Sequence, residues 1–222
     1  LRHPKFGMIP PDVFIRIAEN TGQINALSSL QFRRICRFMK AHPKLREKLL
    51  SVKFNLSPAQ FLKKGYCHSL IAMIHEYDLP VSFFQFEITE TVATEYNEEL
   101  YRFVKELQAE RIGLCLDDFG SGYSSLNLLK NLPIDVLKLD ILFFQKSRDI
   151  RRERIVVSNV INMAKELDIK TIAEGVEDMD TVEFLRKAGC NVIQGYVFAK
   201  PMPQEDFEHL LTDNQDGSFE GC

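Results

Sequence analysis

The sequence predicts an α/β protein whose six parallel strands alternate with helices, and it favours a barrel over an open sheet. Short apolar runs bounded by turn residues alternate along the chain with segments of helical period. Such alternation implies parallel strands joined by right-handed crossovers. Polar or charged residues lie toward the C-terminal end of each predicted strand, which is where barrel enzymes carry their reactive groups.

The strands are predicted from apolar runs of strand length with turn residues on either side. In chain order they cover 52–57, 83–90, 112–118, 136–140, 170–176 and 192–198. An eight-stranded barrel would need two more strands than these six.

The helices are predicted from apolar residues at helical spacing and from their end signals. The first covers roughly 11–40, and the second follows Ser57, where Pro58 and Gln60 complete a proline start and an S-x-x-Q capping box. Further helices are predicted over 97–108, 154–167 and 181–189, the last of them ending at a glycine. We expect one domain over 1–212 and a flexible tail over 213–222.

Composition excludes several classes of function. The formal net charge of −3 argues against binding to DNA or RNA polymers and to anionic membranes. Five cysteines without a C-x-x-C pair indicate reduced thiols and not a disulfide framework or a zinc site. No apolar run is long enough to cross a bilayer, and the first residues lack a signal-peptide core. We therefore expect a cytoplasmic protein, with a membrane tether through segments outside this sequence left open.

An open doubly wound sheet is the alternative architecture for these six strands. Such a sheet binds its ligand at one switch point, usually with a G-x-G-x-x-G loop after the first strand. Here the only similar stretch, Gly120-Ser121-Gly122, follows the third predicted strand and lacks the third glycine. The barrel is the favoured architecture.

Two adjacent carboxylates, Asp117 and Asp118, end the third predicted strand. The two carboxylates repel each other, and burial also removes their solvation. A cation or a shared proton must therefore compensate. Gly120 and Gly122 then allow a sharp turn or the close approach of a ligand. The alternative is a helix-capping aspartate followed by a turn aspartate. This stretch alone does not decide between the two.

The predicted strand ends together carry an acidic set with one amine. Its members are Asn55, Glu87, Asp117, Asp118, Lys138, Glu174 and Gln194. All the metal-type ligands are oxygens, which suits Mg²⁺ or Mn²⁺ better than zinc or copper. Two ions about 3.5–4 Å apart, bridged by Asp117, would clamp a phosphodiester for cleavage. Lys138 would orient or help deprotonate the attacking water, which requires a lowered pKa that the nearby cations would favour.

Each of these residues also has an ordinary structural interpretation. Asn55 suits a turn or a cap, Glu90 and Glu177 suit helix starts, and Lys138 suits a strand-end lysine that reaches solvent. Their convergence on one rim is what favours a metal-dependent phosphoryl-transfer site.

The chain resembles the EAL domain family of bacterial phosphodiesterases specific for cyclic di-GMP. Seven segments carry the resemblance in the family's order and spacing, and they cover nearly all of the chain except its tail. They are HPKFGMIPPDVFIRIAENTG (3–22), FNLSPAQF (54–61), FEITET (86–91), LDDFGSGYSSL (116–126), LPIDVLKLD (132–140), IAEGVE (172–177) and GCNVIQGYVFAKPMP (189–203).

The resemblance implies a modified TIM barrel that hydrolyses cyclic di-GMP to linear pGpG with two Mg²⁺ or Mn²⁺ ions. The following correspondences come from the resemblance alone. The first metal's ligands match Asn55, Glu87 and Asp117, and the second metal's surroundings match Asp117, Asp118 and, partly through water, Glu174. Lys138 matches the lysine implicated in water activation, Glu177 and Gln194 match further active-site positions, and Glu90 matches the residue that tethers the loop containing Gly120 and Gly122. That loop couples the site to dimerisation in the family, which implies a homodimer.

The departure from the family is at the N-terminus. The family has two earlier strands, and the second carries the Glu-Ala-Leu signature with an arginine two residues on, before the segment matched by His3-Pro4. Arg2 is too close to His3 to be that arginine. We therefore expect a longer protein, in which sensory or cyclase-like domains can precede this one. If the protein begins here, hydrolysis should be severely impaired.

Two other functions remain as alternatives. A catalytically inactive EAL-type domain could act as a cyclic di-GMP receptor or signalling module. A partner-binding scaffold without a nucleotide is the other, although unneeded buried carboxylates would only cost stability.

Overall fold

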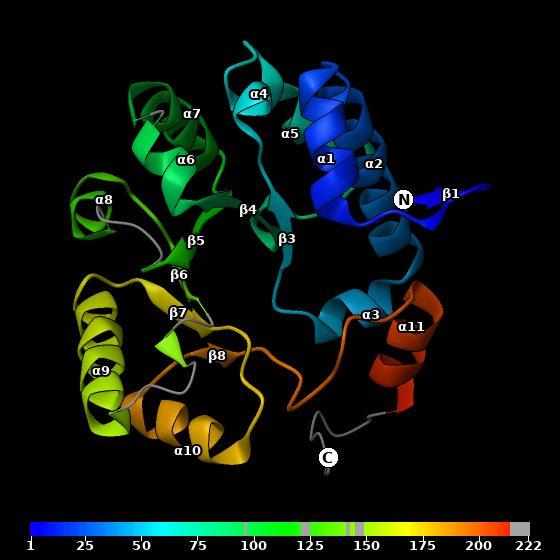
Figure 1. The fold of residues 1–222 in the computed structure, drawn as a ribbon. Coiled ribbons are helices and arrows are strands. Elements are labelled where there is room, and N and C mark those ends of the chain that lie inside the picture. The colour runs from blue at the N-terminus through cyan, green and yellow to red at the C-terminus, as the bar shows by residue number, and fades with distance from the viewer. Residues whose placement is uncertain (96, 121–124, 141–142, 145–148, 214–222) are drawn as a thin grey trace.

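The structure, a computed structural model, describes residues 1–95, 97–120, 125–140, 143–144 and 149–213. A six-stranded parallel sheet forms its centre, with its strands side by side in chain order (Figure 1). The strands are β3 (Val52–Asn55), β4 (Phe84–Thr89), β5 (Gly113–Phe119), β6 (Val136–Leu139), β7 (Lys170–Ala173) and β8 (Val192–Ile193). The sheet curls into half of a barrel, with helices on its outer side. The six predicted strands and the barrel-type α/β fold are confirmed.

The helices flank the strands as predicted, with more breaks than the sequence indicated. They are α1 (Pro11–Asn20), α2 (Ile24–Ala41), α3 (Pro43–Lys48), α4 (Pro58–Phe61), α5 (Tyr66–Glu76), α6 (Glu90–Glu95), α7 (Asn97–Ala109), α8 (Ser125–Asn131), α9 (Ile150–Glu166), α10 (Met179–Ala188) and α11 (Gln204–Asp213). The single helix predicted over 11–40 is two helices, separated near Gly22 at φ +70°. The helix predicted after Ser57 is likewise divided before Gly65 at φ +77°.

Several element boundaries differ from the predicted ones. β7 and β8 end earlier than predicted, because the residues after them form loops at the rim of the sheet. Glu90 begins α6 and does not end β4. A short antiparallel hairpin of β1 (Arg2–His3) and β2 (Gly7–Met8), a 3₁₀ turn over Val81–Phe83, and helix α3 were not predicted. A helix was predicted after every strand, but no residue ranges were predicted for α6, α8 and α11.

Capping contacts stabilise the ends of α4 and α10, of which the Ser57 box and the Gly189 stop were predicted. The backbone amide of Ser57 donates to Gln60 Oε1 at 2.7 Å, as the capping box requires. Asp178 accepts from the amide of Thr181 at 2.8 Å at the start of α10. Gly189 ends that helix in the left-handed conformation at φ +87°.

The two faces of the sheet have different compositions. The outer face packs against the helices, where Phe32 of α2 contacts Phe84 and Phe86. The largest fully buried side chains of this face include Phe84, Phe86, Ile88, Leu114, Leu116, Leu137 and Leu139. The inner face holds only a small apolar layer of Cys115, Val136 and Ile172, against which Val192 packs. Because side chains alternate along a strand, Asp117 and Lys138 lie two residues beyond this layer on the same face.

The cysteines and the length of the apolar helices are two further features predicted from the sequence. Cys36, Cys67, Cys115 and Cys190 are free thiols, and burial raises the pKa of Cys36 and of Cys67 to about 12. Among the described helices none is long and apolar enough to cross a bilayer.

Candidate active site

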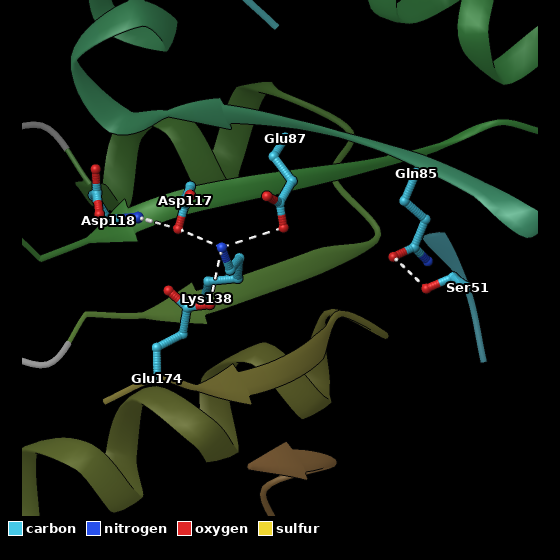
Figure 2. A network of polar contacts seen from close by, with 7 residues as sticks. All are labelled: Ser51, Gln85, Glu87, Asp117, Asp118, Lys138 and Glu174. Carbon is cyan, nitrogen blue, oxygen red and sulfur yellow. Dashed lines mark hydrogen bonds and ion pairs between the residues drawn. The ribbon is translucent and has the colours of Figure 1, made fainter. Parts of the chain in front are cut away.

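Four charged side chains from four consecutive strands meet on the inner face of the sheet (Figure 2). The Lys138 ammonium lies 3.2 Å from Glu87 Oε1, 2.9 Å from Asp117 Oδ1 and 2.9 Å from Glu174 Oε1. Glu87 lies on β4, Asp117 on β5 and Lys138 on β6, and Glu174 directly follows β7. The C-terminal ends of parallel strands share one edge, so residues far apart in sequence converge there. We call these four side chains the Lys138 cluster.

Asn55 lies next to this cluster on the neighbouring strand. It ends β3 and pairs in register with Glu87, so the two side chains leave the same face of the sheet. The amide of Leu56 donates to the Glu87 carbonyl at 2.8 Å, which extends the β3–β4 pairing by one step. Asn55 is exposed and lines a cavity of about 490 Å³ between β3 and the N-terminal helices.

An irregularity in β5 determines how Asp117 and Asp118 are presented. The β5–β6 register shifts between Leu116 and Phe119, and Asp118 has φ +56°. In a regular strand the two side chains would point to opposite faces, but the bulge interrupts that alternation. Both side chains are half-buried, and the Asp118 amide donates to Asp117 Oδ1 at 3.0 Å. The Asp118 carboxyl also shares a hydrogen bond with Asp140.

Glu90 and Gly120 form a contact between α6 and the turn after β5. Glu90 is only 2 % exposed, and its Oε2 accepts from the Gly120 amide at 3.0 Å. Gly120 has φ +96°, a conformation that favours glycine. Glu90 therefore holds the start of this turn, whereas Gly122, the other residue predicted to support the loop, lies outside the described residues.

Gln194 and Glu177 follow β8 and β7 and are both exposed. The Gln194 backbone bridges the loops, because its amide donates to Ala173 at 2.8 Å and its carbonyl accepts from Val176 at 3.2 Å. A Cβ on the next residue, Gly195, would lie 2.0 Å from the Val176 carbonyl oxygen, so glycine permits this close approach. Among the described residues neither side chain forms a hydrogen bond or ion pair with the Lys138 cluster.

Burial and mutual charge shift the pKa values in the cluster. Burial raises the pKa of Glu87 and of Glu174, and Lys138 only partly offsets this effect. Burial lowers the pKa of Lys138, but Glu87, Asp117 and Glu174 outweigh it, so the net shift is upward. The lowered pKa predicted for Lys138 beside metal ions is therefore not produced by these protein groups alone. A lowered pKa would require additional positive charge beside the ammonium.

Asp118 stands in a different electrostatic setting. Burial raises its pKa first, and the nearby Asp117 and Asp140 carboxylates raise it further, while Lys138 opposes them. The pKa of Asp118 is thus raised by burial and by two neighbouring carboxylates. The sequence placed Asp140 at a strand end, but nothing in its spacing indicated that it would contact Asp118.

The donor atoms at the rim fit a hard divalent cation. Asn55, Glu87, Asp117, Asp118 and Glu174 offer only oxygens, as Mg²⁺ and Mn²⁺ prefer. Three of them already converge on one positive charge, the Lys138 ammonium. Within the described ranges, however, no three acidic, imidazole or thiol groups are grouped closely enough to hold a metal ion themselves.

The parallel half-barrel with charged residues at its C-terminal rim defines an α/β domain of the TIM-barrel class. The model of the EAL domain family matches residues 1–201, and the chain belongs to that family.

Two curated relatives from Pseudomonas aeruginosa illustrate the likeness. The chain is 32 % identical over 210 residues to the cyclic di-GMP phosphodiesterase NbdA, covering 95 % of this chain and 27 % of NbdA. It is 33 % identical over 207 residues to the cyclic di-GMP phosphodiesterase RocR, covering 92 % of this chain and 52 % of RocR. The chain thus spans about half or less of the length of these relatives.

A solved structure has the same fold. The PaMucR phosphodiesterase in complex with c-di-GMP superposes with a TM-score of 0.83 at 33 % identity, covering 93 % of this chain and 83 % of that one.

Proposed function

We propose that this chain is a hydrolase domain that converts cyclic di-GMP to linear pGpG by metal-dependent attack of water on a phosphodiester. The observation that carries the proposal is the Lys138 cluster, in which acids from three strand ends surround one cation at the barrel rim. Membership of the EAL domain family and similarity to relatives named cyclic di-GMP phosphodiesterases support it. The activity is proposed for this domain, because the relatives are longer than the chain.

The reaction requires one bond to form and one to break. The oxygen of a water molecule bonds to phosphorus, the bond from phosphorus to the 3′-oxygen breaks, and the proton lost by the water balances the one taken up by the 3′-alkoxide. Two divalent cations, Mg²⁺ or Mn²⁺, would supply charge stabilisation and a more acidic water. In this proposal the metal ligands are Asn55, Glu87, Asp117, Asp118 and Glu174.

The other site residues act through hydrogen bonds. Lys138 orients the water with its ammonium and holds three of the acids together, as its contacts with Glu87, Asp117 and Glu174 already do. Glu177 and Gln194, exposed on the loops after β7 and β8, would contact the substrate. Glu90 supports the turn at Gly120.

Chromatography of the reaction products tests this proposal. The protein containing this chain is incubated with cyclic di-GMP and Mg²⁺ or Mn²⁺, with and without a chelator. We expect pGpG only with metal, and a rate about 10²–10³-fold lower from Asp117→Asn, while Asp180→Asn on the exposed start of α10 behaves like the wild type. Intact substrate in the presence of both metals would contradict the proposal.

A second candidate function is a cyclic di-GMP receptor that does not cleave its ligand. One observation favours it. The carboxylates of the Lys138 cluster form ion pairs with Lys138, and among the described residues no three acidic, imidazole or thiol groups lie close enough together to hold a metal ion. Calorimetric titration of cyclic di-GMP separates the two functions. Binding without turnover would support the receptor, whereas metal-dependent pGpG would exclude it.

Assembly and location complete the proposal. We propose a homodimer in the cytoplasm, joined in the longer protein to sensory or cyclase-like domains. The free buried thiols suit a reducing compartment. Analytical ultracentrifugation would test the dimer, and a monomer at micromolar concentration would contradict it.

A further inference from the structure

The aromatic ring of Phe143 covers the turn that follows the aspartate pair. It stacks on Phe119 with ring centroids 6.4 Å apart and an interplanar angle of 11°. A Cβ built on Gly120 would lie 2.2 Å from Cε2 and 2.3 Å from Cζ of Phe143, and the three nearest atoms all belong to that ring. The ring therefore occupies the space that any side chain at position 120 would need.

Phe143 comes from a segment that follows a separate strand, β6. Its amide donates to the carbonyl of Asp140 at 3.0 Å, so Phe143 lies near the C-terminal end of β6. Phe143 also packs against the main hydrophobic core. Its ring thus contacts both the main core and the turn at Gly120.

Gly120 is held from another direction by Glu90. The buried Glu90 carboxylate accepts from the Gly120 amide at 3.0 Å. Glu90 fixes the backbone nitrogen, and Phe143 blocks movement at the Cα. We call these two contacts the Gly120 clamp.

The Gly120 clamp lies close to Asp118, which is in the part of β5 where the pairing with β6 is irregular. Asp118 is two positions before Gly120, at φ +56°, where the β5–β6 register shifts. Regular ladder pairing does not determine its conformation there. A positive φ at a non-glycine residue persists only when its neighbours enforce it. Asp140, whose carbonyl accepts from the Phe143 amide, is also the hydrogen-bond partner of Asp118.

We propose that Phe143 is a positioning residue which, by clamping Gly120 together with Glu90, fixes the orientation in which Asp118 faces the active site. Phe143 acts through Gly120 and contacts neither the substrate nor the reacting atoms. This role for Phe143 depends on the proposed hydrolase function only where activity is measured.

Phe144 provides a matched control. It is adjacent to Phe143, has the same side chain, is also half-buried and also packs against the main core. None of the three atoms nearest to a Cβ at Gly120 belongs to Phe144. A loss of packing alone should therefore affect both variants, whereas loss of the clamp should affect only Phe143→Ala.

Hydrogen exchange at the Gly120 amide tests the clamp without substrate or metal. We expect exchange in Phe143→Ala to be faster by about tenfold, since local opening exposes this amide. Phe144→Ala should stay within about twofold of the wild type, and Phe143→Leu should be intermediate. Equal exchange rates in Phe143→Ala and Phe144→Ala would overturn the proposal. If Phe143→Ala does not fold, Phe143→Leu is compared with Phe144→Leu in the same way.

Steady-state kinetics test the consequence for Asp118. In Phe143→Ala we expect kcat to fall by about tenfold or more while KM changes by less than about twofold, because a misplaced group lowers turnover more than binding. The Mg²⁺ concentration for half-maximal rate should also rise, and Phe143→Leu should restore part of both. Faster exchange with unchanged kcat and metal dependence would mean a structural role only and would overturn the proposal. If the wild type shows no hydrolysis, the proposed function fails, and calorimetric Mn²⁺ affinity replaces kcat with the same expected order of variants.

Discussion

The two faces of β5 differ sharply although they belong to one strand of seven residues. Leu114 and Leu116 point into the helix-covered face and are almost completely buried. Cys115 and Asp117 alternate with them and point to the inner face, where Asp117 meets Lys138. The outer face contributes stability through buried apolar area, and the inner face holds charges that cost stability. The comparison shows how the period of two lets a single strand serve the fold and the site independently.

Substitution of Asp117 should give the largest effect on function and a small one on the fold. Asp117→Asn keeps the size of the side chain but removes the charge that contacts Lys138. We expect the hydrolysis rate to fall by about 10²–10³-fold, the effect of losing one group that stabilises developing charge. Product formation measured by chromatography and a urea unfolding curve would check both statements. A variant with full activity would remove Asp117 from the site.

Substitution of Lys138 should show that the inner face depends on charge balance. Lys138→Met leaves three acids without their cation and should lower the free energy of unfolding at pH 8 by about 3–5 kcal/mol. Burial already raises the pKa of Glu87 and Glu174 above normal, so their cost to the folded state grows as pH rises through those pKa values. Without the ammonium, the pKa values of Glu87 and Glu174 rise further, so these acids are more protonated at pH 5. The loss of unfolding free energy in Lys138→Met should therefore be smaller at pH 5 than at pH 8. Urea unfolding at both pH values measures this, and an equal deficit at both would contradict it.

Substitution of Leu116 should have the opposite pattern to that of Asp117. Leu116→Ala removes a completely buried side chain and should lower the free energy of unfolding by about 2–4 kcal/mol through lost burial and the cavity left behind. Below the unfolding temperature, the rate per folded molecule should stay near that of the wild type. A large drop in kcat without a loss of stability would contradict the view that the outer face of β5 contributes to stability and the inner face to activity.

The smallest expected effect is at the start of α10, outside both faces. Asp178→Ala removes the side chain that accepts from the Thr181 amide and should cost about 1 kcal/mol, as typical for an N-cap. Asp178→Asn keeps the acceptor and serves as the control. Thermal unfolding followed by circular dichroism distinguishes them, and equal losses in the two variants would assign the effect to charge instead of capping.

Much of this architecture could be predicted because it depends on local patterns. Apolar runs located all six strands, and the S-x-x-Q pattern located the start of α4. Convergence of Glu87, Asp117, Lys138 and Glu174 could be predicted because parallel strands place their C-terminal ends at one rim.

The remaining features depend on contacts between distant segments. The breaks at Gly22 and Gly65 require backbone conformations that a helical pattern does not reveal. The contact of Phe143 with Gly120 joins two turns whose relative placement follows only from the paired strands. The raised pKa of Lys138 could not be predicted from the sequence, because it depends on three acids from separate strands that outweigh its burial.

The strand order of the sheet has a consequence for biosynthesis. Within the described residues, each strand of the six-stranded sheet pairs with the strands next to it along the chain, so a nascent chain can extend the sheet one strand–helix unit at a time as it leaves the ribosome. During this growth, Glu87 and Asp117 emerge before Lys138 and lack its compensating charge. Glu174 emerges last of the four. Synthesis from the N-terminus thus builds the helix-covered face progressively, whereas the charge cluster forms only once β7 has joined the sheet.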